Sequence, residues 1–175
     1  MSNKQSILAS LNDGVSQFNE LISGLNQAAF ETNYNNKWSA GQDLVHLIKV
    51  LKIVNIGFTL PKPLLHLMYG VNKNEARSFE QLQTLYKNAL KDGAKSPSIY
   101  IPKPVLFESK NNLIQKHTTL NQLFIDKMNK HTDIELDRYR LPHPILGKVT
   151  LRELASFTSF HTIHHLELLR SKLNS

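Results

Sequence analysis

Two histidines near the end of the chain have a spacing that could bind a metal ion. His161 and His165 are four residues apart within a stretch of helical periodicity at residues 150–173. Residues four apart on an α-helix lie on the same face, so the two imidazoles would lie side by side. Two neutral imidazoles can bind one divalent cation, and a third ligand from elsewhere would leave a position for water or substrate. The candidate third ligand is His46, in an earlier apolar helix.

The spacing alone is a weak indication of a metal site. The chain has eight histidines in 175 residues, so a pair four residues apart also arises by chance. No Glu directly follows His161, which distinguishes the segment from the zincin motif, where that Glu is the general base. A lone histidine on an apolar helix face is more often a hydrogen-bonded core residue than a metal ligand. Four other histidines have no partner at ligand spacing, and we interpret them as structural or exposed: His66, His117, His131 and His143.

The composition limits the kind of site that the chain can build. A chain of 175 residues with 41% hydrophobic residues fits one globular domain, residues 1–175, with a sizeable core. No cysteine is present, which excludes disulfides, thiolate metal sites and a cysteine nucleophile. A tight metal site must therefore use histidine and carboxylate ligands.

We expect a cytoplasmic protein with no membrane partner. The first residues lack the basic and apolar segments of a secretory signal, and no apolar run reaches the roughly 18 residues of a membrane-spanning helix. The net charge of +7 suggests nucleic acid as a partner, but the basic residues are dispersed along the sequence. Lys87, Lys91 and Lys95 line one helical face, which could attract phosphates non-specifically. We interpret this face as an ordinary solvent-exposed helix surface. We therefore predict no specific nucleic-acid partner.

Apolar periodicity predicts four long helices and no extended β-structure. The predicted helices cover residues 4–30, from 39 to just before 61, 105–130 and 150–173. Gly24 weakens the first helix without ending it. Ser39 with Gln42, and Thr150 with Glu153, have the spacing of N-cap pairs. Four such helices predict an all-α, antiparallel four-helix bundle, an architecture that builds metal sites from side chains on facing helices.

The region between the second and third helices, residues 60–104, is predicted to be an irregular insertion. Within it, residues 78–91 have the periodicity of a helix, which Asp92-Gly93 would close. The expected connections are a polar turn, a proline-rich extended segment and a proline-containing connector, at residues 31–37, 96–104 and 141–147. Side chains from this insertion and from several helices would shape any pocket, so the substrate cannot be named from the fold.

Three segments together resemble the DinB-like superfamily, which includes the YfiT-type metal-dependent hydrolases. The first is Trp38-Ser39-Ala40-Gly41-Gln42-Asp43-Leu44-Val45-His46, with a tryptophan eight residues before a histidine. The second, from His143 to Thr150, is similar to the family's His-Pro-x-x-Gly-x-x-Thr lead into the last helix. The third, His161-Thr162-Ile163-His164-His165, resembles its His-x-x-x-His segment.

The resemblance implies a four-helix bundle that holds a divalent metal ion through His46, His161 and His165. It also implies a homodimer, and either hydrolysis or thiol-dependent transfer on a small-molecule substrate. Because the chain has no cysteine, a low-molecular-weight thiol would come from the substrate side. Three imidazoles suit zinc, nickel and iron, so the identity of the metal stays open.

The residue that would move a proton is not determined by the sequence. An ion on three histidines would lower the pKa of a water, polarise a carbonyl or stabilise a thiolate. His164, Asp43 and Glu153 are the candidates for a general acid or base. Asp43 or Glu167 could also orient a ligand imidazole by accepting a hydrogen bond. A rival hypothesis is a non-enzymatic, stress-related helical binding module with a structural or vestigial metal site.

Overall fold

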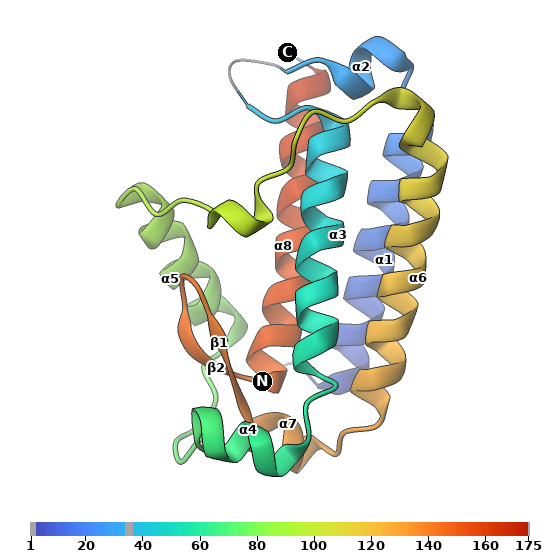
Figure 1. Cartoon of the computed structure of the whole chain (residues 1–175). Coiled ribbons are helices and arrows are strands. Elements are labelled where there is room, and N and C mark those ends of the chain that lie inside the picture. Colours follow the sequence, from blue (N-terminus) through green and yellow to red (C-terminus); the bar gives the residue numbers. More distant parts are fainter. Residues whose placement is uncertain (1–2, 34–36, 175) are drawn as a thin grey trace.

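The four predicted helices form a bundle in which two helices run one way and two run the other (Figure 1). The computed structural model describes residues 3–33 and 37–174. The bundle helices are α1 (Lys4–Ser23), α3 (Ala40–Gly57), α6 (Lys110–Asn129) and α8 (Leu151–Leu173). In Figure 1, α1 and α8 run upward while α3 and α6 run downward. Both α1 and α3 pack against α6 and α8. The predicted all-α bundle is confirmed, with α1/α6 and α3/α8 as its antiparallel neighbours.

The direction of α3 and α6 explains why the connection between them is long. Since α3 and α6 are neighbours that run in the same direction, the chain between them must return along the bundle. The 18 residues of α3 span about 27 Å at 1.5 Å per residue. The return passes through α4 (Lys62–Tyr69), α5 (Phe79–Lys91), which packs on α8, and a segment with one 3-10 turn, η1 (Ser98–Tyr100), beside α3. The insertion therefore lies along the side of the bundle where α3 and α8 are found (Figure 1).

The N-caps predicted for α3 and α8 are confirmed. The Ser39 hydroxyl accepts a hydrogen bond from the Gln42 amide, and the Gln42 side chain accepts one from the Ser39 amide. Thr150 and Glu153 make the same reciprocal pair at the start of α8. Each pair satisfies two N–H groups that have no partner within the helix, so the position of each helix start is set locally.

The first predicted helix ends earlier than expected. α1 ends at Ser23, and a short helix, α2 (Gln27–Glu31), follows it. Asn26 lies between them in an extended conformation, with φ −75° and ψ 174°, and its side chain accepts a hydrogen bond from the Ala29 amide. The prediction that Gly24 would not end the helix was wrong, because an Asn N-cap stabilises the start of a second helix.

Three short elements were not predicted. α4 begins directly after Pro61, and a second proline in its first turn is tolerated because first-turn amides have no intrahelical partner. α7 (Asp133–Arg138) and a hairpin of β1 (Arg140–His143) and β2 (Gly147–Thr150) occupy the connector before α8. Each strand has four residues, too few for an alternating pattern to stand out. Gly147 starts β2 with φ 72°, a conformation that favours glycine at the hairpin turn.

The start of α6 differs from the expected boundary, and one expected turn can be compared only in part. α6 starts at Lys110 rather than at residue 105, after a 3-10 turn, η2 (Phe107–Ser109). The polar turn expected at residues 31–37 lies partly outside the described residues. Among the described residues, no single helix is long and apolar enough to cross a membrane, and α3 and α4 reach that length only together, across a 103° bend.

Two apolar clusters fill the bundle and leave the histidine segment between them. On α8, the cluster nearer the hairpin includes residues up to Phe160. The second cluster, nearer the C-terminus of the chain in Figure 1, includes Leu166 and Leu169. His161 and His165 therefore lie at the level where one apolar cluster gives way to the other.

Candidate metal centre

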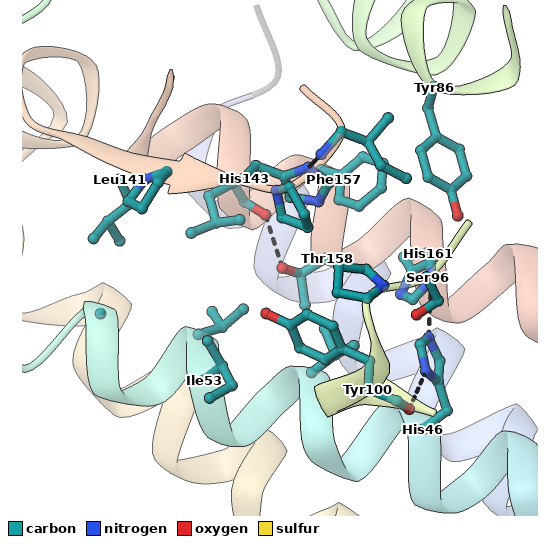
Figure 2. Close-up of a pocket in the computed structure, with 18 of the residues that line it drawn as sticks. His46, Ile53, Tyr86, Ser96, Tyr100, Leu141, His143, Phe157, Thr158 and His161 are labelled. Atoms are coloured by element: carbon teal, nitrogen blue, oxygen red, sulfur yellow. Dashed lines mark hydrogen bonds between the residues drawn. The ribbon is translucent and has the colours of Figure 1, made fainter. Parts of the chain in front are cut away.

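Three imidazoles from two packed helices converge at one point. α3 carries His46, and α8 carries His161 and His165. All three side chains are buried, and each offers a ring nitrogen that lies within 4.8 Å of those of the other two. The Nε2 atoms of His46 and His161 are 3.4 Å apart (Figure 2). The structure therefore brings together the three residues that the sequence analysis selected.

Hydrogen bonds on the far side of two rings fix which nitrogen faces the cluster. His46 Nδ1 lies 3.1 Å from the carbonyl oxygen of Tyr100. A carbonyl can only accept, so Nδ1 carries the hydrogen and a neutral ring keeps its lone pair on Nε2. His165 Nδ1 lies 3.1 Å from Asp43 Oδ1, which fixes the same tautomer. This arrangement is the one that orients histidine ligands in metal sites.

Asp43 holds its position through a buried ion pair. Its Oδ2 accepts a hydrogen bond from the Lys172 ammonium group, which also donates to the Trp38 carbonyl at 2.9 Å. Burial raises the pKa of Asp43, and the nearby Lys172 charge opposes that shift. Glu167, the other predicted orienting residue, is exposed, and within the described chain it makes no hydrogen bond to a ligand histidine.

All three imidazoles are neutral at neutral pH. Burial lowers the pKa of His46, and it lowers the pKa values of His161 and His165 further, well below the usual value for histidine. The neighbouring histidines add to the lowering for His161 and His165, because each ring disfavours a positive charge on the next. Neutral rings have lone pairs available, which is the state that metal binding requires.

The donor set and its spacing fit a divalent ion. Zinc–nitrogen bonds of about 2.0–2.1 Å in a tetrahedral site place two ligand nitrogens about 3.3–3.4 Å apart. The 3.4 Å between the Nε2 atoms of His46 and His161 matches that spacing. The fit is least complete at His161, whose Nδ1 is buried without a hydrogen-bond partner among the described residues. The His161 ring is held by packing instead, stacked on Phe157 at 5.7 Å between ring centroids.

Trp38 covers the cluster from the side of the α3 N-terminus. Its ring centroid lies 4.9 Å from that of His46, and it stacks on His165 at 6.4 Å with an interplanar angle of 8°. The tryptophan that precedes His46 in the sequence therefore packs directly on two of the three histidines.

A cavity of about 370 Å³ opens beside the three histidines (Figure 2). α3, α8, the β1 end of the hairpin and the insertion all contribute to its walls. Its volume falls in the range of about 300–1,000 Å³ that small-molecule sites occupy. The cluster of ring nitrogens is therefore positioned to meet a small ligand.

The three candidate proton-transfer residues have different surroundings. His164 is half-buried and lines the cavity, and burial lowers its pKa. Asp43 lies behind His165, with both oxygens hydrogen bonded. Glu153 does not line the cavity. Each Glu153 oxygen accepts two hydrogen bonds, from the Arg77 side chain and backbone and from the Thr150 amide.

Burial by itself raises the pKa of Glu153, but the hydrogen bonds and charge of Arg77 and the Thr150 amide lower it overall. Glu153 is thus the N3 carboxylate of the α8 capping box, and it ties the loop at residue 77 to the start of α8. Of these three candidates, only His164 lines the cavity.

Several lining residues were not selected from the sequence. His143, interpreted as structural or exposed, accepts two backbone hydrogen bonds in its turn and also lines the cavity. The one feature of the sequence that could have indicated its place at the site is its position in the family-like His-Pro-x-x-Gly segment. Tyr86 lies in the helix predicted at residues 78–91, and Tyr100 lies in the proline-rich segment of the insertion. Neither segment indicates by its own pattern which distant residues it contacts.

The fold and the histidine cluster define a class of protein, a four-helix bundle with three histidines on two packed helices. The sequence model of the DinB superfamily matches residues 10–169, and the chain belongs to this superfamily.

Among solved structures, the chain is similar to YfiT from Bacillus subtilis, described as a probable metal-dependent hydrolase with an unusual four-helix bundle topology. The two share 15% sequence identity with a TM-score of 0.60, over 99% of this chain and 90% of that chain, a likeness of fold. None of the curated proteins compared with this chain matches it.

Proposed function

We propose that this protein is a metal-dependent enzyme that binds a divalent ion through His46, His161 and His165 and acts on a small-molecule substrate. The observation that carries the proposal is the convergence of three buried, neutral imidazoles beside a cavity. Two of them already have Nδ1 hydrogen bonded to an acceptor, which leaves Nε2 for a ligand. Membership of the DinB superfamily and the description of YfiT support the same activity class.

Each residue has a role in this proposal. A divalent ion supplies Lewis acidity, which lowers the pKa of a water or thiol and polarises a substrate carbonyl. The Tyr100 carbonyl and Asp43 keep His46 and His165 in the orientation that ligation needs. His164 is the candidate for moving a proton at the cavity, since the oxygens of Asp43 and Glu153 are committed elsewhere.

Hydrolysis and thiol transfer both remain compatible with this site. Zinc, nickel and iron all accept imidazole ligands, and we propose no choice among them. We also propose a low-molecular-weight thiol and a homodimer, as the family resemblance implies, and a cytoplasmic location.

Metal analysis of three purified proteins tests the proposal. We expect wild type grown with added zinc, nickel and iron to carry about one ion per chain, and His161→Ala to lose most of it. His66→Ala, at an exposed histidine on α4, is the matched control and should keep the wild-type content. Near-zero metal in both wild type and His161→Ala would refute the metal site.

Turnover separates the enzyme from a binding module. Wild type and His164→Gln are assayed against panels of esters, amides and thiol acceptors, with and without chelator. Metal-dependent turnover with any member supports the enzyme. A stably bound metal without turnover in any panel, together with a large loss of thermal stability on chelation, supports the non-enzymatic module instead.

A further inference from the structure

The cavity beside the three histidines contains no charged side chain. Among the described residues, no Asp, Glu, Lys or Arg lines it. Its polar side chains are five histidines, three tyrosines, one tryptophan, one serine and one threonine. Aliphatic side chains also line the cavity, with Ile53, Leu60, Leu141 and Ile145 among them.

Three charged residues close to the cavity, Lys49, Asp43 and Lys172, have partners outside it. Lys49, one turn after His46 on α3, donates its ammonium group to the Ile101 carbonyl at 2.7 Å. Asp43 and Lys172 lie behind His165 and pair with each other. A charged group on a substrate body would therefore lose its water and meet no opposite charge on these walls, which is strongly unfavourable.

His143 is the lining residue whose hydrogen-bonding capacity is most clearly defined. Its Nδ1 accepts hydrogen bonds from the amides of Ile145 and Leu146, at 3.2 and 3.1 Å. Because Nδ1 is an acceptor, the neutral ring carries its hydrogen on Nε2. Burial, with a contribution from the Arg77 charge, lowers the pKa of His143 to about 4, so the ring stays neutral.

His143 is half-buried and lines the cavity, and no hydrogen bond joins its Nε2–H to an acceptor among the described residues. The ring packs edge-on against Phe157, at 4.6 Å between centroids, and Phe157 stacks in turn on His161. Figure 2 shows His143, Phe157 and His161 along the same wall of the cavity. A hydrogen-bond donor of fixed tautomer thus lies beside the histidine cluster.

We propose that this cavity binds substrates with an uncharged, apolar body, and that His143 donates its Nε2–H to an acceptor oxygen of the substrate. The chemical class is aryl or alkyl esters, amides and ketones. The inference rests on the proposed function only in placing the reacting group beside the three histidines.

Three probes of similar shape test the inference in chelator-treated protein, so that the result does not depend on the metal. They are acetonaphthone, its analogue with a carboxylate on the far ring, and ethylnaphthalene, which lacks the oxygen. Dissociation constants come from ligand-observed NMR titrations. We expect the carboxylate to bind at least about tenfold more weakly than the neutral ketone, because its charge is desolvated without a partner. Equal affinities would overturn the proposed substrate class.

His143→Asn tests the donor. The Asn side-chain oxygen keeps an acceptor for the turn amides but does not place a donor at the Nε2 position. We expect ketone affinity to fall about three- to tenfold while ethylnaphthalene affinity stays unchanged. His66→Asn is the exposed control, and melting temperatures verify folding. Equal losses for ketone and hydrocarbon would refute the role of His143.

The outcomes also separate this inference from the metal site. Wild-type protein that holds no metal but binds the ketone over the carboxylate refutes the metal site alone. Metal-replete protein that binds none of the neutral probes refutes the cavity proposal alone. If His143→Asn does not fold, the wild-type comparison of the three probes still decides the substrate class.

Discussion

Replacing Asp43 by Asn should damage both the stability of the bundle and the metal affinity of His165. The Asp43 carboxylate is 2% exposed, and it bridges the His165 ring and the Lys172 ammonium group. An Asn side chain has one acceptor and one donor group where the carboxylate has two acceptors. Its single oxygen can therefore accept a hydrogen bond from His165 or from Lys172, but not from both.

The two possible Asn orientations have different consequences. If the amide oxygen faces Lys172, the amide NH₂ faces His165 Nδ1 and moves the ring hydrogen to Nε2, which then cannot bind a metal. If the oxygen faces His165, the NH₂ lies against the Lys172 ammonium group. The positive charge of Lys172 favours the first orientation, so we expect metal affinity to fall about 10- to 100-fold.

The stability loss can be estimated from the burial of the pair. Removing one partner of a buried ion pair costs about 3–5 kcal/mol. Lys172 still donates to the Trp38 carbonyl in the variant, so we expect a value near the lower end, about 3 kcal/mol. For a chain of this size that corresponds to a melting temperature about 6–12 °C lower.

Lys172→Met is the matched control, because it breaks the same ion pair and leaves Asp43 hydrogen bonded to His165. Thermal unfolding in chelator measures stability, and competition with a chromophoric chelator measures metal affinity. We expect Lys172→Met to lose comparable stability but to keep metal affinity within about threefold of wild type. If both variants weaken metal binding equally, or if Asp43→Asn changes neither quantity, the orienting role of Asp43 is refuted.

Three further changes have defined outcomes. Burial lowers the pKa of His117 to about 4, whereas the unfolded chain titrates near 6.5, so the unfolded state takes up the proton first and stability falls as pH drops through that interval. Between pH 7.5 and 4.5, the free energy of unfolding of His117→Gln should therefore fall by about 2–3 kcal/mol less than that of wild type, as measured by urea unfolding. An identical pH dependence of the two proteins would contradict this.

Glu153→Gln keeps the capping hydrogen bond to the Thr150 amide but loses the ion pair with Arg77. We therefore expect about 1–2 kcal/mol of destabilisation and an unchanged metal content. Loss of turnover without destabilisation would instead make Glu153 catalytic. A Cβ at Gly41 would lie 2.7 Å from the Phe30 ring, so Gly41→Ala should lower the free energy of unfolding by about 1–3 kcal/mol. Gly24→Ala is the control: its Cβ would meet nothing closer than 3.7 Å, so its free energy of unfolding should stay within about 1 kcal/mol of wild type.

The parts of the fold that were predictable depend on short-range patterns. Ser39 with Gln42, and Thr150 with Glu153, are three residues apart, so each helix start can be recognised within one turn. Long apolar periodicity identified the four bundle helices for the same reason. The β-hairpin was missed because its strands have four residues each, and the break after Ser23 was missed because periodicity continues through it.

The sequence by itself determined the bundle, the pairing of His161 with His165 on one helix face, and the absence of any thiolate ligand. Those properties follow from helical geometry and composition, which act over a few residues. Only the tertiary structure decided what lies next to these rings. It placed His46 Nε2 at 3.4 Å from His161, the Tyr100 carbonyl behind His46, and Asp43 behind His165.

The tertiary structure likewise removed Glu153 from the cavity by pairing it with Arg77, and it brought His143 into the cavity wall. These contacts join residues dozens of positions apart, and they depend on the path that the insertion takes across the bundle. Their geometry arises from the packing of side chains from separate elements, which no local pattern in the sequence contains.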